Sequence, residues 1–164
     1  MTPAPGAPHG FGRPAGHEAP AAPDAPAACP CGGGAYASCC GPLIAGERLA
    51  ATAEQLMRSR YSAFALAAQD SRAIEHLLRT HPEPGQPQAT RRKALQAGCR
   101  DIQWLGLSVL DGQNGGPLDA SGTVTFEARW RDRAGREGTL RECSRFARDA
   151  SGTWLYIEAL SLSD

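Results

Sequence analysis

Residues 29–41 of the chain read CPCGGGAYASCCG, which places four cysteines within thirteen positions. A segment this short and this rich in glycine cannot bury enough apolar surface to fold through hydrophobic contact alone. The glycines after Cys31 allow a sharp turn, and Pro30 restricts the backbone between the first two thiols. The chain then returns to Cys39 and Cys40, so two thiols come from each end of the loop. We therefore expect a metal ion or disulfides to hold this segment.

Three kinds of cross-link suit four neighbouring cysteines. Disulfides can join Cys39 to Cys40, or either of them to the first pair, but they persist mainly in exported proteins. An iron–sulfur cluster also takes four thiolates, although its usual cysteine spacings differ. A single Zn²⁺ ion bound by four thiolates is the interpretation that we favour. The remaining cysteines, Cys99 and Cys143, are interpreted as small buried apolar residues.

The composition limits the size and the partners of the protein. With 164 residues, 13 of them proline and 19 glycine, the chain has room for one ordinary domain and a small appendage. Its formal net charge is zero, so no global field attracts nucleic acid or an anionic membrane. No secretory signal or membrane-spanning apolar run is visible. We expect a cytoplasmic protein with reduced thiols, no membrane partner and three parts: a disordered arm (1–28), a zinc knuckle (29–46) and a larger domain (47–164).

The larger domain begins with a helical pattern and ends with a strand pattern. Thr52, followed three residues later by Gln55, is a typical helix start. Helices are expected over 53–68, from residue 70 or 71 to Pro82, and over 91–97 after a Thr90 cap. After Asp101 the apolar period becomes twofold, which predicts four strands. Their alternating residues are Leu105, Leu107 and Val109; Val124, Phe126, Ala128 and Trp130; Leu140 and Phe146; and Leu155, Ile157 and Ala159. Helices followed by a strand meander indicate an α+β fold, with helices packed on a curved antiparallel sheet.

The third predicted strand contains a carboxylate on its apolar face. If Phe146 faces the core, alternation places Glu142 and Ser144 there too. A buried carboxylate needs a partner, and the first helix offers Arg58 and Arg60. One interpretation is a structural ion pair, and the alternative is a ligand pocket. The residues proposed for that pocket are Arg58, Arg60, Tyr61, Trp104, Trp130, Glu142 and Ser144.

The opposite face of the second and third strands carries Arg129, Arg131, Arg141 and Arg145. A solvated sheet face is the simplest interpretation, because arginine stems cover apolar surface. The same face can also meet RNA phosphates or an acidic partner. It lacks interleaved exposed aromatic residues, so sequence-specific single-strand binding is unsupported.

Four stretches resemble a known family: residues 29–43, 52–64 with the run MRSRYSAF, 104–107, and 142–146 with the run ECSRF. They are similar to the bacterial YchJ-like proteins, over roughly residues 29–158. The resemblance implies an N-terminal SEC-C zinc motif, of the type also found at the C-terminus of the SecA translocation motor. It further implies a cone-shaped domain similar to nuclear transport factor two. Carried over by position, the zinc ligands are Cys29, Cys31, Cys39 and Cys40, although the loop between Cys31 and Cys39 is one residue shorter than usual.

The family has no firmly assigned activity, so the resemblance implies a fold and a metal. We expect a structural Zn²⁺ site without an open ligand position, supporting a surface that recognises a protein partner, and a role other than catalysis. The alternative is a small-ligand or enzymatic pocket inside the cone that uses Glu142. A third hypothesis is binding of RNA, or of the translation and export machinery, through the arginine face.

Overall fold

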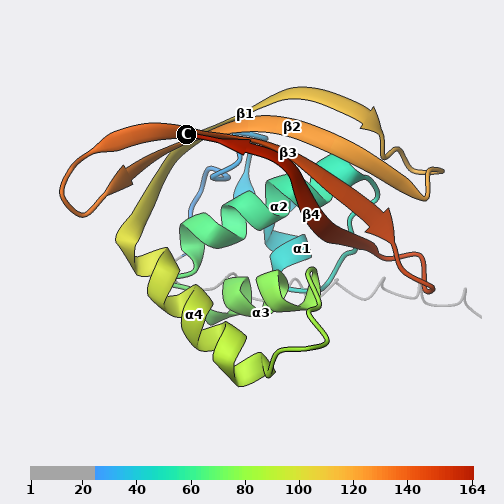
Figure 1. Ribbon diagram of the computed structural model, residues 1–164, viewed down its shortest axis with the longest axis horizontal. Helices are drawn as coiled ribbons and strands as arrows, with labels where there is room; N and C mark the ends of the chain where they lie inside the picture. Colours follow the sequence, from blue (N-terminus) through green and yellow to red (C-terminus); the bar gives the residue numbers. More distant parts are fainter. Residues whose placement is uncertain (1–24) are drawn as a thin grey trace, which may run out of the picture.

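The computed structural model describes residues 25–164, and residues 1–24 of the predicted arm lie outside this range. The predicted α+β class is confirmed, with helices first and a four-stranded sheet second (Figure 1). The elements are a 3₁₀ helix η1 (Tyr36–Ser38), the helices α1 (Gly41–Ile44), α2 (Ala53–Leu66), α3 (Ser71–Arg79) and α4 (Gln88–Asp101), and the strands β1 (Ile102–Asn114), β2 (Ser121–Asp132), β3 (Glu137–Arg148) and β4 (Trp154–Ser163).

The sheet is an antiparallel meander in the order β1-β2-β3-β4. Figure 1 shows it arching over α2, with α3 and α4 on the far side of that helix. Irregularities in the two edge strands accompany this curvature, since the register skips Leu105 and Leu110 in β1 and Ile157 and Leu160 in β4. Such bulges bend a strand and increase its twist. A cavity lies between the curved sheet and the helices.

Strand alternation is as predicted in β2 and β3 but not in β4. Val124 and Ala128 are buried in β2, and Ser144 and Phe146 in β3. In β4 the residue opposite Phe146 is Tyr156, and Trp154 is the buried neighbour on that face, so the inward assignment of Leu155 and Ile157 is wrong. Because β4 carries apolar residues on both faces, the sequence pattern does not show which of them face the core.

The start of α2 was predicted correctly, and the start of α4 was not. Thr52 caps α2 as predicted: its Oγ1 accepts from the Gln55 amide at 3.1 Å, and the Gln55 side chain accepts from the Ala51 amide at 2.8 Å. The expected 91–97 helix is too short, because α4 starts directly after Pro87, whose fixed φ suits a helix entry, and runs into β1. Gly98 therefore lies inside α4 instead of ending it.

Two clusters of buried side chains form the core. The first joins the cysteine segment to α2 and α3, and includes Tyr36, Ile44, Ala63 and Leu77. The second lies under the sheet and consists of Ala53, Leu56, Met57, Val124, Phe146 and Trp154. The cysteine segment thus packs on the larger domain, while the boundary predicted between residues 46 and 47 stays a prediction.

Candidate functional site

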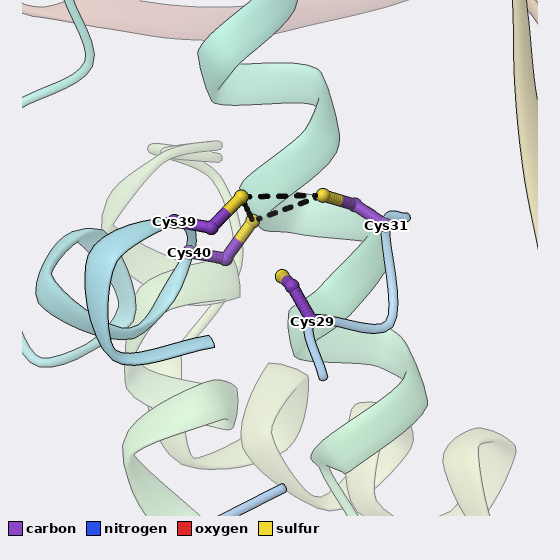
Figure 2. Close-up of side chains that lie close together, drawn as sticks. All are labelled: Cys29, Cys31, Cys39 and Cys40. Carbon is purple, nitrogen blue, oxygen red and sulfur yellow. Dashed lines mark hydrogen bonds between the residues drawn. The ribbon is translucent and has the colours of Figure 1, made fainter. Parts of the chain in front are cut away.

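The four clustered cysteines point toward one common centre beside α2 (Figure 2). Their sulfur atoms all lie within 4.8 Å of one another. The Sγ atoms of Cys31 and Cys39 are 3.5 Å apart, those of Cys31 and Cys40 3.7 Å, and those of Cys39 and Cys40 3.9 Å. Tetrahedral thiolates at about 2.3 Å from one zinc ion have sulfurs about 3.8 Å apart. The donor set therefore fits a single tetrahedral metal ion.

The competing cross-links fit this geometry less well. All six cysteines are free thiols, and 3.5 Å is far longer than a disulfide bond of about 2.05 Å. An iron–sulfur cluster spreads its four thiolates around more than one iron atom, which requires sulfurs farther apart than these. The arrangement is thus able to bind one metal ion.

Glycines make the tight turn between the two cysteine pairs possible. Gly32 and Gly34 have φ angles of +80° and +115°, which other residues rarely adopt. Gly33 passes so close to the thiols that an added Cβ would lie 2.9 Å from the Cys39 sulfur. The Cys29 amide donates to the Gly34 carbonyl at 2.8 Å and closes the turn. The loop shortened by one residue therefore still brings the thiols together.

Side chains from the larger domain hold the knuckle in place. The Arg58 guanidinium on α2 donates to the Cys31 carbonyl at 3.1 Å, and the Arg48 guanidinium donates to the Cys39 carbonyl at 3.0 Å. The Ser62 hydroxyl lies 3.5 Å from the Cys29 sulfur. These two arginines place positive charge beside a centre that carries net negative charge when four thiolates bind one divalent ion. Arg58 thus serves the knuckle and not the pocket for which it was proposed.

The crowded thiols do not all ionise easily by themselves. Burial, followed by hydrogen bonds with neighbouring cysteines, raises the pKa of the Cys39 thiol to about 11. The pKa of Cys29 is lowered, because the thiols of Cys31 and Cys40 can donate to its sulfur. Four thiolates at these distances repel one another strongly and need a cation among them.

A second candidate site is a partly open cavity of about 600 Å³ that is lined mainly by the sheet, α2 and α4. Five of the residues proposed for a pocket line it: Arg60, Tyr61, Trp104, Glu142 and Ser144. Trp130, like Arg58, is not among the lining residues. Its ring lies over Gly138 on β3, where an added Cβ would come within 2.5 Å of the indole. The remaining walls are mostly apolar and aromatic.

Glu142 faces this cavity and is not clamped by an arginine. Its Oε1 accepts from the Ser144 hydroxyl at 2.5 Å and from the Tyr156 hydroxyl at 3.2 Å. Burial, reinforced by the nearby Glu142 charge, raises the pKa of Tyr156 to about 12, which keeps that hydroxyl protonated as a donor. Oε2 has no hydrogen-bond partner among residues 25–164, yet no side-chain polar atom that is both buried and unpaired occurs there. The free oxygen is therefore open to the cavity.

Arg60 places a positive charge at the cavity wall. Its Nη1 donates to the Leu77 carbonyl at 3.1 Å and to the Thr80 hydroxyl at 2.6 Å, and the guanidinium lies 4.9 Å from the centre of the Tyr156 ring. Burial lowers the pKa of Arg60 to about 10, so it stays charged at neutral pH. The Arg60–Glu142 ion pair considered from the sequence does not form within the described residues.

The remaining polar residues of the cavity lining were not predicted from the sequence. Arg91 pairs with Glu83 at 2.7 Å and donates to the His81 carbonyl, and the His81 Nε2 lies 3.4 Å from a carboxylate oxygen of Glu83. Tyr156 belongs to the strand whose parity was misassigned. The prolines around residues 82–87 marked only a loop, so no sequence pattern linked these residues to Glu142.

A buried serine–histidine pair elsewhere in the structure is not a catalytic dyad. The Arg79 Nη2 lies 2.8 Å from the His76 Nδ1, and since arginine only donates, Nδ1 must accept. The proton of the neutral ring is then on Nε2, which donates to the Ser59 hydroxyl at 2.8 Å. A general base for serine would have to accept from it. Arg79 also donates to the Leu43 and Ile44 carbonyls, so the network fastens α3 to α1.

The outer arginine face is largely neutralised. Arg131 pairs with Glu137, Arg141 with Glu127 at 3.4 Å, and Arg145 with Glu158 at 2.7 Å. These carboxylates compete with phosphates for the guanidinium groups. The geometry therefore does not favour the nucleic-acid hypothesis.

The fold and the site together define a class of protein: an α+β domain with a curved sheet packed on helices, joined to a four-cysteine knuckle able to bind a metal ion. A family model described as YchJ, middle NTF2-like domain, matches residues 52–159. The chain belongs to this YchJ-like family, as its sequence resemblance predicted. No helix within residues 25–164 combines the length and the apolar character needed to cross a membrane.

Relatives of known sequence and structure agree with this assignment. A UPF0225 protein of Ralstonia nicotianae is 45% identical over 139 residues, covering 80% of this chain and 89% of the relative. Another UPF0225 protein, from Chromobacterium violaceum, is 40% identical over 134 residues, covering 81% and 92%. The solution structure of a SEC-C motif containing protein from Rhodopseudomonas palustris aligns with a TM-score of 0.68 at 34% identity, covering 83% of this chain and 99% of that one.

Proposed function

We propose that this chain is a small-molecule-binding protein whose binding domain is buttressed by a structural zinc site. The observation that carries the proposal is the cavity of about 600 Å³ that reaches Glu142 while leaving one of its carboxylate oxygens open. A buried structural ion pair would instead have joined Glu142 to an arginine without a void. Cavities of this size, mostly apolar with a few convergent polar groups, are typical of small-molecule sites.

An NMR titration with a small aromatic probe such as naphthalene tests the cavity proposal. We expect amide shifts along the cavity-lining residues of α4 and β3, and none around the four clustered cysteines of residues 29–40. Gly98→Leu adds a side chain at the cavity wall. Gly98 lines the cavity, and an added Cβ would meet nothing within 4 Å. The variant should retain the fold and weaken probe binding. Unchanged spectra at saturating probe would contradict a small-molecule function.

Zinc is the metal that we propose for the knuckle. The sulfur spacing supports one tetrahedral ion, and four thiolates favour Zn²⁺ over oxygen-preferring ions. With all ligands from protein, such a site stabilises structure and leaves no position for a reacting water. The proposal also assigns the protein to the cytoplasm, where thiols stay reduced.

Metal analysis of the purified full chain tests the zinc assignment. We expect one zinc and no iron per chain, with at least half of the zinc lost in Cys39→Ser. Cys143→Ser, which alters a half-buried thiol outside the cluster, is the control and should keep full metal content. Stoichiometric iron, or a chain that retains no metal, would refute this part of the proposal.

A second candidate function is recognition of a protein partner by the knuckle. The turn from Gly32 to Ala35 is exposed, whereas three of the four cysteines beneath it are buried. A structural metal would thus fix the shape of an outward surface. Ala37, two residues after this turn, is also exposed. Ala37→Glu alters the outer surface of the knuckle without replacing a thiol, and partner capture that survives this change would argue against the knuckle as the contact.

A further inference from the structure

Two opposite charges in the cavity face the same space without joining. Glu142 Oε2 has no hydrogen-bond partner among the described residues, and neither do the Nε and Nη2 atoms of Arg60. Both side chains contact Tyr156, Glu142 through the hydroxyl and Arg60 over the ring. Because unpaired polar atoms in the described residues are not sealed from solvent, these groups are open to the cavity. A vacant acceptor and vacant donors therefore lie around one tyrosine.

The charge balance of the cavity favours a neutral occupant. Its lining carries two arginines, Arg60 and Arg91, and two carboxylates, Glu83 and Glu142. An anionic ligand attracted by Arg60 would be repelled by Glu142. A cationic ligand attracted by Glu142 would be repelled by Arg60. A hydroxyl group suits both neighbours, because its oxygen accepts while its proton donates.

We propose that the cavity binds an uncharged aromatic molecule through a hydroxyl that donates to Glu142 Oε2 and accepts from Arg60. This inference rests on the proposed small-molecule function and specifies its ligand class. The walls around this polar centre supply ring faces and edges for an aromatic body. The aromatic lining residues are Tyr61, Phe64, Trp104, Phe126, Phe146 and Tyr156.

Three probes of the same ring size test the head group: 2-naphthol, naphthalene and 2-naphthoate. Each is titrated by calorimetry and NMR into the zinc-loaded full chain at neutral pH, where naphthol is neutral and naphthoate anionic. We expect naphthol to bind roughly tenfold more tightly than naphthalene, because it gains a hydrogen bond to a charged group. Naphthoate should bind most weakly, since its carboxylate meets Glu142.

Glu142→Gln gives the sharpest readout. Naphthol affinity should fall roughly tenfold, while naphthoate affinity should rise because Arg60 is left uncompensated. General damage to the fold would weaken both probes together. Glu158→Gln, which removes a carboxylate from the outer sheet face, is the matched control and should change neither affinity.

The outcomes separate the two levels of the hypothesis. If naphthalene binds but naphthol binds no better, or if Glu142→Gln leaves naphthol affinity unchanged, the hydroxyl inference is overturned and the small-molecule function stands. If none of the three probes shifts cavity residues, both are overturned.

Discussion

Helix α2 separates two regions that treat polar groups differently. On its knuckle side, Ser59 bonds to His76 and Arg58 donates to the Cys31 carbonyl. On its cavity side, one oxygen of the Glu142 carboxylate has no hydrogen-bond partner among the described residues. Hydrogen bonds within the protein stabilise its structure, whereas an unpaired group costs stability unless something binds it. The knuckle side thus fastens segments of the chain to one another, whereas the cavity side keeps an open acceptor that a ligand can use.

Removing the metal should produce the largest effect and separate the two regions. Structural zinc sites contribute on the order of 10 kcal/mol to ordering their segments. We expect chelation to raise amide hydrogen exchange across residues 25–46, while the sheet stays protected. The cluster of Leu56, Val124, Phe146 and Trp154 explains this difference, because it includes no knuckle residue. Exchange measured by mass spectrometry with and without chelator provides the check.

Two results would contradict the expectation that only the knuckle depends on the metal. Loss of protection throughout residues 52–164 would show that the cavity side also depends on the metal. Unchanged exchange in the knuckle would show that its packing on α2 suffices without an ion. Cys143→Ser serves as the control for thiol loss, and its exchange pattern should match that of the native chain.

Two glycine-to-alanine changes should have opposite signs in the two regions. At Gly41, an added Cβ would lie 2.7 Å from the Tyr36 carbonyl oxygen, so Gly41→Ala should cost about 1–3 kcal/mol. At Gly98 the same Cβ meets nothing within 4 Å, so Gly98→Ala should stabilise α4 by about 0.5–1 kcal/mol. Denaturant unfolding of both zinc-loaded variants measures the difference. A loss of stability at both positions would mean that the cavity side is packed as tightly as the knuckle.

The knuckle could be predicted from the sequence because its information is local. Four cysteines and four glycines within residues 29–41 limit the possible cross-links, and the ligand set needs no knowledge of distant strands. The inward position of Glu142 and Ser144 was also predictable, because β3 pairs regularly with β2 and keeps its alternation. Local pattern and observed geometry agree wherever the backbone is regular.

The rest of the cavity depends on contacts between distant segments. The bulge at Ile157 and the mixed apolar faces of β4 concealed Tyr156, which bonds to Glu142. Arg58 and Arg60 are two residues apart on one helix, so they point to different sides, and periodicity alone did not decide which side met the sheet. Only the packed helix assigns Arg58 to the knuckle and Arg60 to the cavity.

A pH titration should show whether His76 on the knuckle side is held as a neutral, hydrogen-bonded ring. Burial, followed by the charges of Arg79 and Arg60, lowers the pKa of His76 to about 3, against 6.5 for the free side chain. Below pH 6.5 the unfolded chain thus binds a proton that the folded chain does not. Stability should fall by up to about 1.4 kcal/mol for each pH unit from 6.5 down toward 3.

His76→Gln keeps an acceptor for Arg79 and a donor for Ser59, and should lack this contribution. The difference in unfolding free energy between the two proteins should therefore shrink steadily between pH 6.5 and 5. Parallel curves over this range would mean that His76 is not held neutral by its surroundings.

The smallest effect is expected on the outer sheet face, which belongs to neither region. Arg145 pairs there with Glu158 at 2.7 Å, and both side chains are about half exposed. Exposed pairs of this kind contribute about 0–1 kcal/mol, so Arg145→Ala should change the unfolding free energy by less than about 1 kcal/mol.

The same variant tests the nucleic-acid hypothesis. If Arg145 contacts a phosphate, its removal should make RNA binding weaker and less dependent on salt. We expect no RNA binding by either protein at physiological salt, because three of the four arginines on this face already have carboxylate partners. Salt-dependent binding that Arg145→Ala weakens would assign a recognition role to a surface that otherwise only covers the sheet.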